Sequence, residues 1–248
     1  MSTKVAEPGF LTATKSRVVF VEGKDEGQFF SALARYLELP DEIQFIDVGG
    51  KDNLRPMIRA LKDRSEWAEV VTSVGVVRDA DNDPRAAFQS ICDALQSAGL
   101  ARPTAPLKPA GSSPQVMAMV LPDIETPGML EDLCLRSVES DRAMTCVDEY
   151  FCCLEQRLEQ LPQNPSKARV QAFLASREVL EEAHFDLLQE CVKGLLSELP
   201  DSRSLSRIHT FLASRYKSAL NLGLAAQAKY WPLDNPAFAE VRRFLSTL

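Results

Sequence analysis

The sequence has few residues of the kinds that build transition-metal sites. Only two histidines occur, His184 and His209, and the six cysteines show no Cys-x-x-Cys spacing. A structural zinc site needs four such ligands at short, characteristic spacings, so the pattern argues against one. We therefore interpret both histidines as structural residues, and the cysteines as small buried side chains in a reducing cytoplasm.

Long apolar runs and an excess of positive charge are also missing. No stretch approaches the roughly 18 consecutive apolar residues of a membrane span, and the N-terminus lacks an apolar targeting segment. The formal net charge is −7, with a pI of about 5.1. This argues against broad binding of duplex DNA through many Lys and Arg contacts, although a local basic groove or a bound cation is compatible with it. We expect a cytoplasmic protein without a membrane partner.

What the sequence does contain is an alternation of strand and helix patterns. With 45% hydrophobic and 25% charged residues, it has the composition of an ordinary globular protein. Helical spacing of apolar residues covers 25–39 and begins again near Leu54 and Pro84. These segments separate four apolar runs that predict strands, at 17–22, 43–48, 70–77 and 115–121. The alternation predicts an α/β fold with a mostly parallel, four-stranded sheet flanked by helices.

The pattern changes after about residue 140. Residues 1–16 are polar and predict a loosely held N-terminal arm, and residues 17–140 contain the strands. Residues 141–248 predict an all-helical C-terminal region packed on the α/β domain. Its helical patterns span 142–160, 167–179, 181–198 and 203–228.

Carboxylates follow two of the predicted strands. Glu22 ends the first apolar run, and Asp79 and Asp81 follow the third. The carboxyl ends of parallel strands meet at one edge of a sheet, where ligands bind in open α/β folds. Three anions there would repel one another, and Mg²⁺ or Mn²⁺ would relieve the repulsion with oxygen ligands. The plain alternative for Glu22 alone is a solvated carboxylate, and Asp83 is better suited to cap a helix.

Four short motifs together resemble the Toprim family. They are Val-Glu-Gly-Lys-Asp, Gly-Gly-Lys-Asp-Asn-Leu, Asp-Ala-Asp and Gly-Met-Leu-Glu-Asp-Leu, at residues 21–25, 49–54, 79–81 and 128–133. The resemblance covers residues up to about 140, with a weaker match near Lys229, and is closest to small stand-alone bacterial Toprim proteins. Topoisomerases, primases and the overcoming-lysogenization-defect nucleases share the domain. Arg78 departs from the family pattern, which has an apolar strand residue there.

The resemblance implies a Rossmann-like Toprim fold and a division of roles among the acidic residues. Glu22 would bind a metal ion or act as a general base, with Asp79 and Asp81 as metal ligands. The related nucleases carry a second acidic residue at the spacing of Glu26. Glu131 would serve a second metal ion, although a helix N-terminus favours carboxylates without any metal. Beyond the first 140 residues, the resemblance assigns a phosphate-stabilising role to Lys229.

The loop after the second strand is a candidate phosphate site. Gly50 and Asn53 lie where the strand turns into a helix, and backbone N–H groups at such turns can hold phosphate. Lys51, and Lys24 after the first strand, could add point charges. The alternative is a plain turn. Trp231 could stack a base, but a place in the core suits it better.

Three functions are compatible with these features. The first is a Mg²⁺-dependent nucleic-acid phosphodiesterase that acts on DNA or RNA; the resemblance adds a role in anti-phage defence, with a partner protein of such a system. The second is a non-catalytic module that binds nucleotide or a partner protein. The third is a homodimer whose acidic edge holds a structural ion. A topoisomerase would need a tyrosine-bearing second domain, and a primase would need zinc-binding regions; neither is present.

Overall fold

The computed structural model describes residues 12–157, 162–177 and 222–248. The strands are β1 (Arg17–Val21), β2 (Ile43–Asp47), β3 (Ser73–Asp79) and β4 (Gln115–Leu121). The helices are α1 (Lys24–Tyr36), η1 (Lys51–Asn53), α2 (Leu54–Lys62), α3 (Trp67–Val70), α4 (Pro84–Ser97), α5 (Leu130–Ser137), α6 (Arg142–Arg157), α7 (Pro165–Ala175), α10 (Leu222–Gln227), η2 (Pro236–Phe238) and α11 (Ala239–Thr247).

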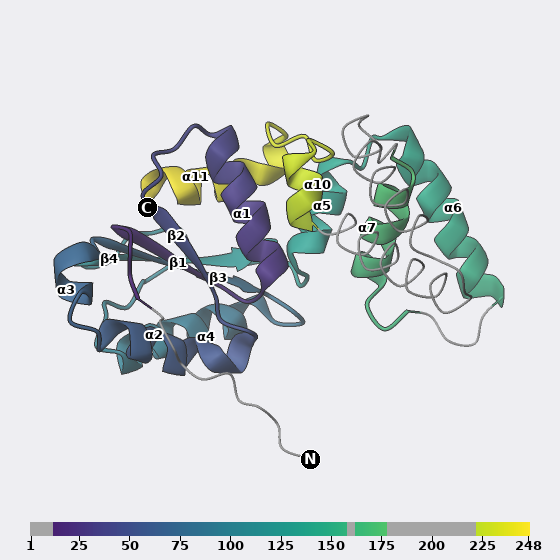
Figure 1. Ribbon diagram of the computed structural model, residues 1–248. Helices are drawn as coiled ribbons and strands as arrows, with labels where there is room; N and C mark the ends of the chain where they lie inside the picture. The colour runs from purple at the N-terminus through teal and green to yellow at the C-terminus, as the bar shows by residue number, and fades with distance from the viewer. Residues whose placement is uncertain (1–11, 158–161, 178–221) are drawn as a thin grey trace, which may run out of the picture.

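The strands form one parallel sheet in the order β2-β1-β3-β4, which confirms the predicted α/β class (Figure 1). Val19 pairs with Phe45 on one side and with Gly75 on the other. After β1 the chain moves outward to β2, and it then crosses back to the far side of β1 for β3. The strand order therefore reverses between β1 and β3, and the carboxyl ends of such a pair form the usual ligand crevice of an open sheet.

Helices cover both faces because successive side chains of a strand point to opposite sides. Val18 and Phe20 face α2 and α4, whereas Val19 and Val21 face α1 and α11. All four side chains are at most 1% exposed. Figure 1 shows α1 and α11 on one side of the sheet and α2 and α4 on the other.

The third strand differs from its prediction at both ends. Val70 belongs to α3, which is anchored by the buried Trp67, so β3 begins only at Ser73. At the other end the strand continues past Val77 to Asp79, which pairs with Leu121 of β4. The apolar run was a poor guide here because a short buried helix and a buried strand have similar composition.

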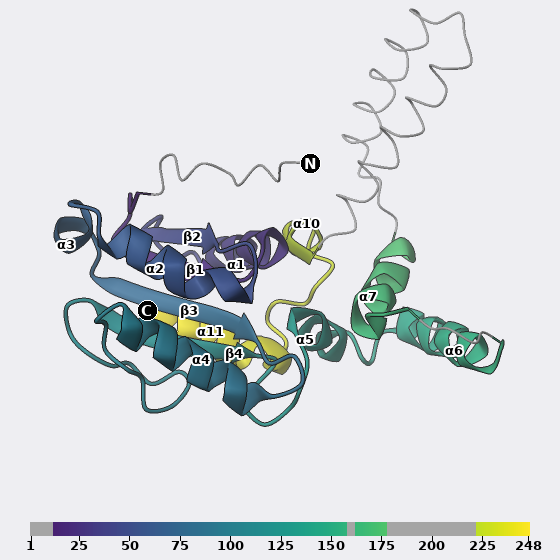
Figure 2. The same cartoon turned by 90° about the horizontal axis from the view of Figure 1, so that it is seen from below.

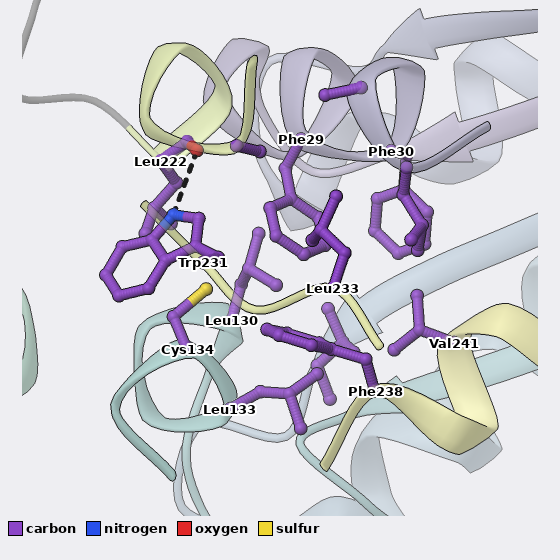
Figure 3. Packing of buried hydrophobic residues seen from close by; sticks show 14 of the residues in the cluster. Phe29, Phe30, Leu130, Leu133, Cys134, Leu222, Trp231, Leu233, Phe238 and Val241 are labelled. Carbon is purple, nitrogen blue, oxygen red and sulfur yellow. Dashed lines mark hydrogen bonds between the residues drawn. The ribbon is translucent and has the colours of Figure 1, made fainter. Parts of the chain in front are cut away.

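Elements from the end of the chain complete the core of the sheet. α11 lies so close to β3 that a Cβ on Gly75 would meet the Phe244 ring at 2.7 Å. Figure 3 shows Trp231, Leu233 and Phe238 packed among side chains of α1 and α5, with the Trp231 indole donating to the Leu222 carbonyl at 3.3 Å. Trp231 is 1% exposed and stacks on Phe173, so it is a core residue.

α6 and α7 lie beyond the carboxyl edge of the sheet, next to α5, in both Figure 1 and Figure 2. α6 agrees with the helical pattern over 142–160 up to its end at Arg157, and α7 begins two residues before the predicted 167. The patterns at 181–198 and most of 203–228 lie outside the described residues, as do His184, His209 and most of the predicted arm. Within the described ranges, no helix is long and apolar enough to cross a membrane.

Candidate active site

The carboxyl ends of β1 and β3 bring acidic side chains from several elements together. Glu22 follows β1, Asp79 ends β3, Glu26 lies in the first turn of α1, and Glu131 lies in the first turn of α5. We call these four residues the acidic cluster. Their elements converge because β1 and β3 are neighbours, and because α1 and α5 begin at the same edge of the sheet.

Asp79 is the most constrained member of the acidic cluster. It is 9% exposed, and its Oδ1 accepts the Leu130 N–H of the first turn of α5 at 3.1 Å. Burial, and then the charges of Glu26, Glu22 and Glu131, raise the pKa of Asp79 well above its usual range. The Leu130 N–H acts in the opposite direction and does not compensate.

The pKa values of the other three members are also raised. Burial is the largest cause that raises the pKa of Glu22, of Glu26 and of Glu131. Glu131 is 8% exposed, and the negative charge of Glu26 adds to the rise in its pKa. The charge of Glu26 also raises the pKa of Glu22. Buried carboxylates with raised pKa values are common at functional sites.

Two basic side chains partly balance this charge. Arg78 Nε lies 3.2 Å from Glu22 Oε1, with both side chains mostly buried, and it opposes the rise in the pKa of Glu22. Lys51 Nζ lies 2.9 Å from Asp81 Oδ2 in a more exposed pair. Arg78, the residue that departs from the Toprim pattern, is therefore the internal counter-ion of Glu22.

Asp81 lies beside the acidic cluster, and its negative charge adds to the rise in the pKa of Glu22. Its φ of 51° is unusual for a residue other than glycine, and its N–H and C=O both bond to Gly128. This bridge joins the turn after β3 to the turn before α5. Asp83 caps α4 through the Ala86 N–H, as predicted.

The Gly-Gly loop is less open to phosphate than its sequence suggests. Gly49 donates its N–H to Asp47 Oδ1 and Gly50 donates to the Glu22 carbonyl, both at 2.8 Å. Asn53 donates its side-chain amide to the Gly49 carbonyl and its own N–H to the Gly50 carbonyl. The amides of Gly49, Gly50 and Asn53 thus already have partners within the protein, and a phosphate would have to compete with these hydrogen bonds. Lys51 remains the cation of this loop.

Two further lysines are candidates from the sequence. Lys24 is exposed in the first turn of α1. Lys229 is exposed just after α10 with a φ of 59°, and no hydrogen bond or ion pair of its side chain to the acidic cluster occurs among the described residues.

A lysine that the sequence patterns did not single out acts on the acidic cluster. The positive charge of Lys167, in the first turn of α7, opposes the raised pKa of both Glu26 and Glu131. α7 is held in place by the Ser166 hydroxyl, which donates to Asp132 Oδ1 at 2.6 Å. Asn164 and Pro165 mark the start of this helix in the sequence, but nothing local indicates that it docks beside the sheet edge.

The residues of the acidic cluster fit a hard cation by the type of their donor atoms. Every donor is a carboxylate oxygen, which suits Mg²⁺ or Mn²⁺ and not a soft metal. In the described part of the chain, however, no three His, Cys, Asp or Glu side chains already converge as a metal-binding group. The carboxylates of Glu22 and Asp81 would have to turn away from Arg78 and Lys51 to join Asp79, Glu26 and Glu131 around an ion.

Comparisons with known proteins add a family and distant structural similarities. Two solved structures of the C-terminal region of the Xanthomonas campestris pv. campestris OLD protein match with 16% and 17% identity. Each match covers 94% of this chain and 93% or 94% of the other, with TM-scores of 0.40 and 0.42. No curated protein matches. A family model described as "Protein of unknown function (DUF3226)" matches residues 16–185, and the chain therefore belongs to this family.

Proposed function

We propose that this protein hydrolyses phosphodiester bonds of nucleic acid with the help of Mg²⁺ or Mn²⁺. The observation that carries the proposal is the acidic cluster at the point where the strand order reverses. Four carboxylates lie largely buried there, the charges of the other three raise the pKa of Asp79, and Arg78 pairs with Glu22 alone. The Toprim resemblance supports the same reaction, and it adds a role in anti-phage defence as a further proposal.

Each acidic group then has a role that follows from its position. Asp79, Glu26 and Glu131 would hold the cation, together with Glu22 and Asp81 once these leave their basic partners. When bound, the ion would supply positive charge that offsets the charge developing on the phosphate oxygens.

Glu22 is suited to accept a proton from the attacking water. Its raised pKa brings it closer to the working pH, where a general base is most effective. Lys51 contacts Asp81, and the charge of Lys167 acts on Glu131, so both lysines are placed to bind phosphate oxygens near the acidic cluster.

The test is metal-dependent cleavage of plasmid DNA and of tRNA. Wild type with Mg²⁺ or Mn²⁺ should cleave at least one of them, and Asp79→Asn should lower the rate by roughly two orders of magnitude or more. Glu69→Gln, which removes an exposed carboxylate of α3, is the matched control and should behave as wild type. Equal cleavage by Asp79→Asn and wild type would reject the proposal.

Two lysine variants separate the candidates for phosphate binding. Lys167→Met should raise KM or lower kcat about tenfold, because its charge acts directly on the acidic cluster. Lys229→Met removes the lysine to which the resemblance assigns phosphate stabilisation. It should have the smaller effect, because the causes of the raised pKa values in the acidic cluster include the charge of Lys167 and not that of Lys229.

The ion pairs favour a second candidate, a non-catalytic module that binds nucleotide or a partner protein. Arg78 and Lys51 already occupy Glu22 and Asp81, and the donors are not convergent in the described residues. Absence of cleavage, with nucleotide binding that needs no divalent cation, would favour this candidate.

A further inference from the structure

A row of basic residues begins at the acidic edge and follows the surface of α2. Lys51 lies in η1, and Arg55, Arg59 and Lys62 lie in α2. With 3.6 residues per turn, the three α2 residues fall within about 60° of one another around the helix axis. They occupy one flank, beside the buried stripe of Leu54, Ile58 and Leu61. We call these four basic residues the α2 row.

Part of the α2 row has a structural task. Arg59 donates from Nε and Nη2 to the Ser97 carbonyl at 3.1 and 2.8 Å, and Lys62 donates to the Ala98 carbonyl. Cations at the end of α4 satisfy its last carbonyls and suit its dipole. This task uses two of the five N–H donors of Arg59 and leaves its charge in place.

The same task does not explain Arg55. Arg55 is exposed, and no hydrogen bond or ion pair of its side chain occurs in the described ranges. Lys51 extends the row to the sheet edge, where it contacts Asp81. Arg55 therefore has no structural role among the described residues, and Lys51 connects the row to the candidate active site through Asp81.

The charge of this segment is opposite to that of the whole chain. Residues 51–64 contain five basic residues, at 51, 55, 59, 62 and 64, and two acidic ones, at 52 and 63. The segment is thus +3, whereas the chain is −7. In an acidic protein a polyanion is repelled from most of the surface, so a local basic row decides where it can lie.

We propose that the α2 row binds the phosphate backbone of a nucleic-acid strand and leads it away from the acidic cluster. The inference rests on the proposed function, since it assigns the path of that substrate. The row starts at Asp81, beside the acidic cluster, and ends beside the C-terminus of α4, toward the opposite edge of the sheet. Four residues of α-helix rise about 6 Å, so Arg55 and Arg59 are spaced to contact separate phosphates. Such contacts position a strand without reading its sequence.

The experiment measures binding without cleavage. Asp79→Asn protein in EDTA is titrated into a short fluorescent duplex DNA, and separately into a single-stranded RNA, at several salt concentrations. Adding Arg55→Gln should weaken binding roughly three- to tenfold and make the slope of log K against log salt shallower by about one. Arg35→Gln, which removes an exposed charge from the last turn of α1, is the matched control and should change neither quantity.

The outcomes separate this inference from the proposed function. Wild-type protein is assayed in parallel for cleavage of the same two probes with Mg²⁺ or Mn²⁺. Binding that depends on Arg55, without cleavage of either probe by wild type, upholds the α2 row and rejects hydrolysis. Cleavage together with equal binding by the Arg55→Gln and Arg35→Gln variants upholds hydrolysis and overturns the row. Failure of both probes to bind also overturns it. The preferred probe tells whether the strand is DNA or RNA, and an unchanged melting temperature excludes misfolding of Arg55→Gln.

Discussion

At the scale of single residues, the acidic cluster lowers the stability of the folded protein at neutral pH, because burial and neighbouring charges disfavour ionised Asp79. Asp79 is buried beside three other carboxylates, so its ionised form is costly in the folded protein. The sequence shows that a carboxylate ends this strand. The cost arises first from the burial of Asp79, and then from Glu26, Glu22 and Glu131, whose charges the fold brings close to it.

Asp79→Asn should therefore stabilise the protein in the absence of metal. The change removes a buried charge, and the new side chain keeps an oxygen for the Leu130 N–H. We expect the melting temperature at neutral pH in EDTA to rise by a few degrees, on the order of 1 kcal/mol or more. Mg²⁺ should raise the melting temperature of wild type but not of this variant. A lower melting temperature for Asp79→Asn in EDTA would contradict this account of the cluster.

Asp123 lies in the turn between β4 and α5, and its pKa is shifted in the direction opposite to that of Asp79. Partial burial acts to raise its pKa, but hydrogen bonds from Thr126, Arg136 and the backbone of Glu125 outweigh it and lower the pKa to about 2, from 3.8. Because the folded-state pKa is the lower one, this carboxylate stabilises the protein above about pH 4, and the contribution is lost as the pH falls toward 2.

Asp123→Asn should remove this pH-dependent contribution to stability. Denaturant unfolding near pH 6 should show a loss on the order of 1 kcal/mol, because the pair with Arg136 is partly exposed and screened. The difference from wild type should shrink as the pH approaches 2. A difference that stays constant across this range would mean that the turn depends on hydrogen-bond geometry and not on charge.

At the scale of elements, helix contacts decide which residues reach the site. α10 lies against α1 so closely that a Cβ on Gly223 would meet Gln28 Cβ at 2.1 Å and the backbone of Phe29 at 3.0 Å. α1 carries Glu26, so this contact supports the position of one member of the acidic cluster. The sequence gives little warning of it, since Gly223 lies almost two hundred residues after α1.

Gly223→Ala should destabilise the protein by about 1–3 kcal/mol, because α10 must move away from α1 to admit the methyl group. Gly27→Ala is the matched control within α1. Its Cβ would lie 3.5 Å from Val21 Cγ2, an ordinary contact, so it should stabilise the helix by about 0.5–1 kcal/mol. Denaturant unfolding measures the change in the free energy of unfolding for each variant. Equal losses in the two variants would show that the packing of α10 on α1 does not need a glycine at position 223.

At the scale of the whole molecule, the two ends of the described chain share one core. β1 near the beginning and α11 at the end both pack in the cluster that contains Phe29 and Phe244. The face of the sheet that α1 covers only in part is completed by α11, which lies side by side with it in Figure 1. Loss of α11 contacts should therefore affect the complete fold and not only its end.

Phe244→Ala tests this dependence. The ring is fully buried, and it approaches both Gly75 of β3 and Phe30 of α1. We expect a loss of about 3–5 kcal/mol in the free energy of unfolding, in a single cooperative transition. A small loss, or separate unfolding of α11 before the sheet, would show that the last helix is an independent addition.

Local patterns in the sequence were enough to predict the four strands, apart from the bounds of the third, and to place acidic residues at the ends of two of them. Apolar runs bounded by Gly, Pro and Asp marked four parallel strands. Glu22, Asp79 and Asp81 stood out because they follow two such runs, whose carboxyl ends meet at one edge of a parallel sheet.

Which charges meet one another depends instead on the tertiary packing. Arg78 turns toward Glu22, Lys167 arrives on a distant helix, and the Gly49 and Gly50 amides are consumed by hydrogen bonds around the loop. The pair of Arg78 with Glu22 and the position of Lys167 near Glu131 both join segments far apart in the chain. The local spacing of residues cannot predict such contacts.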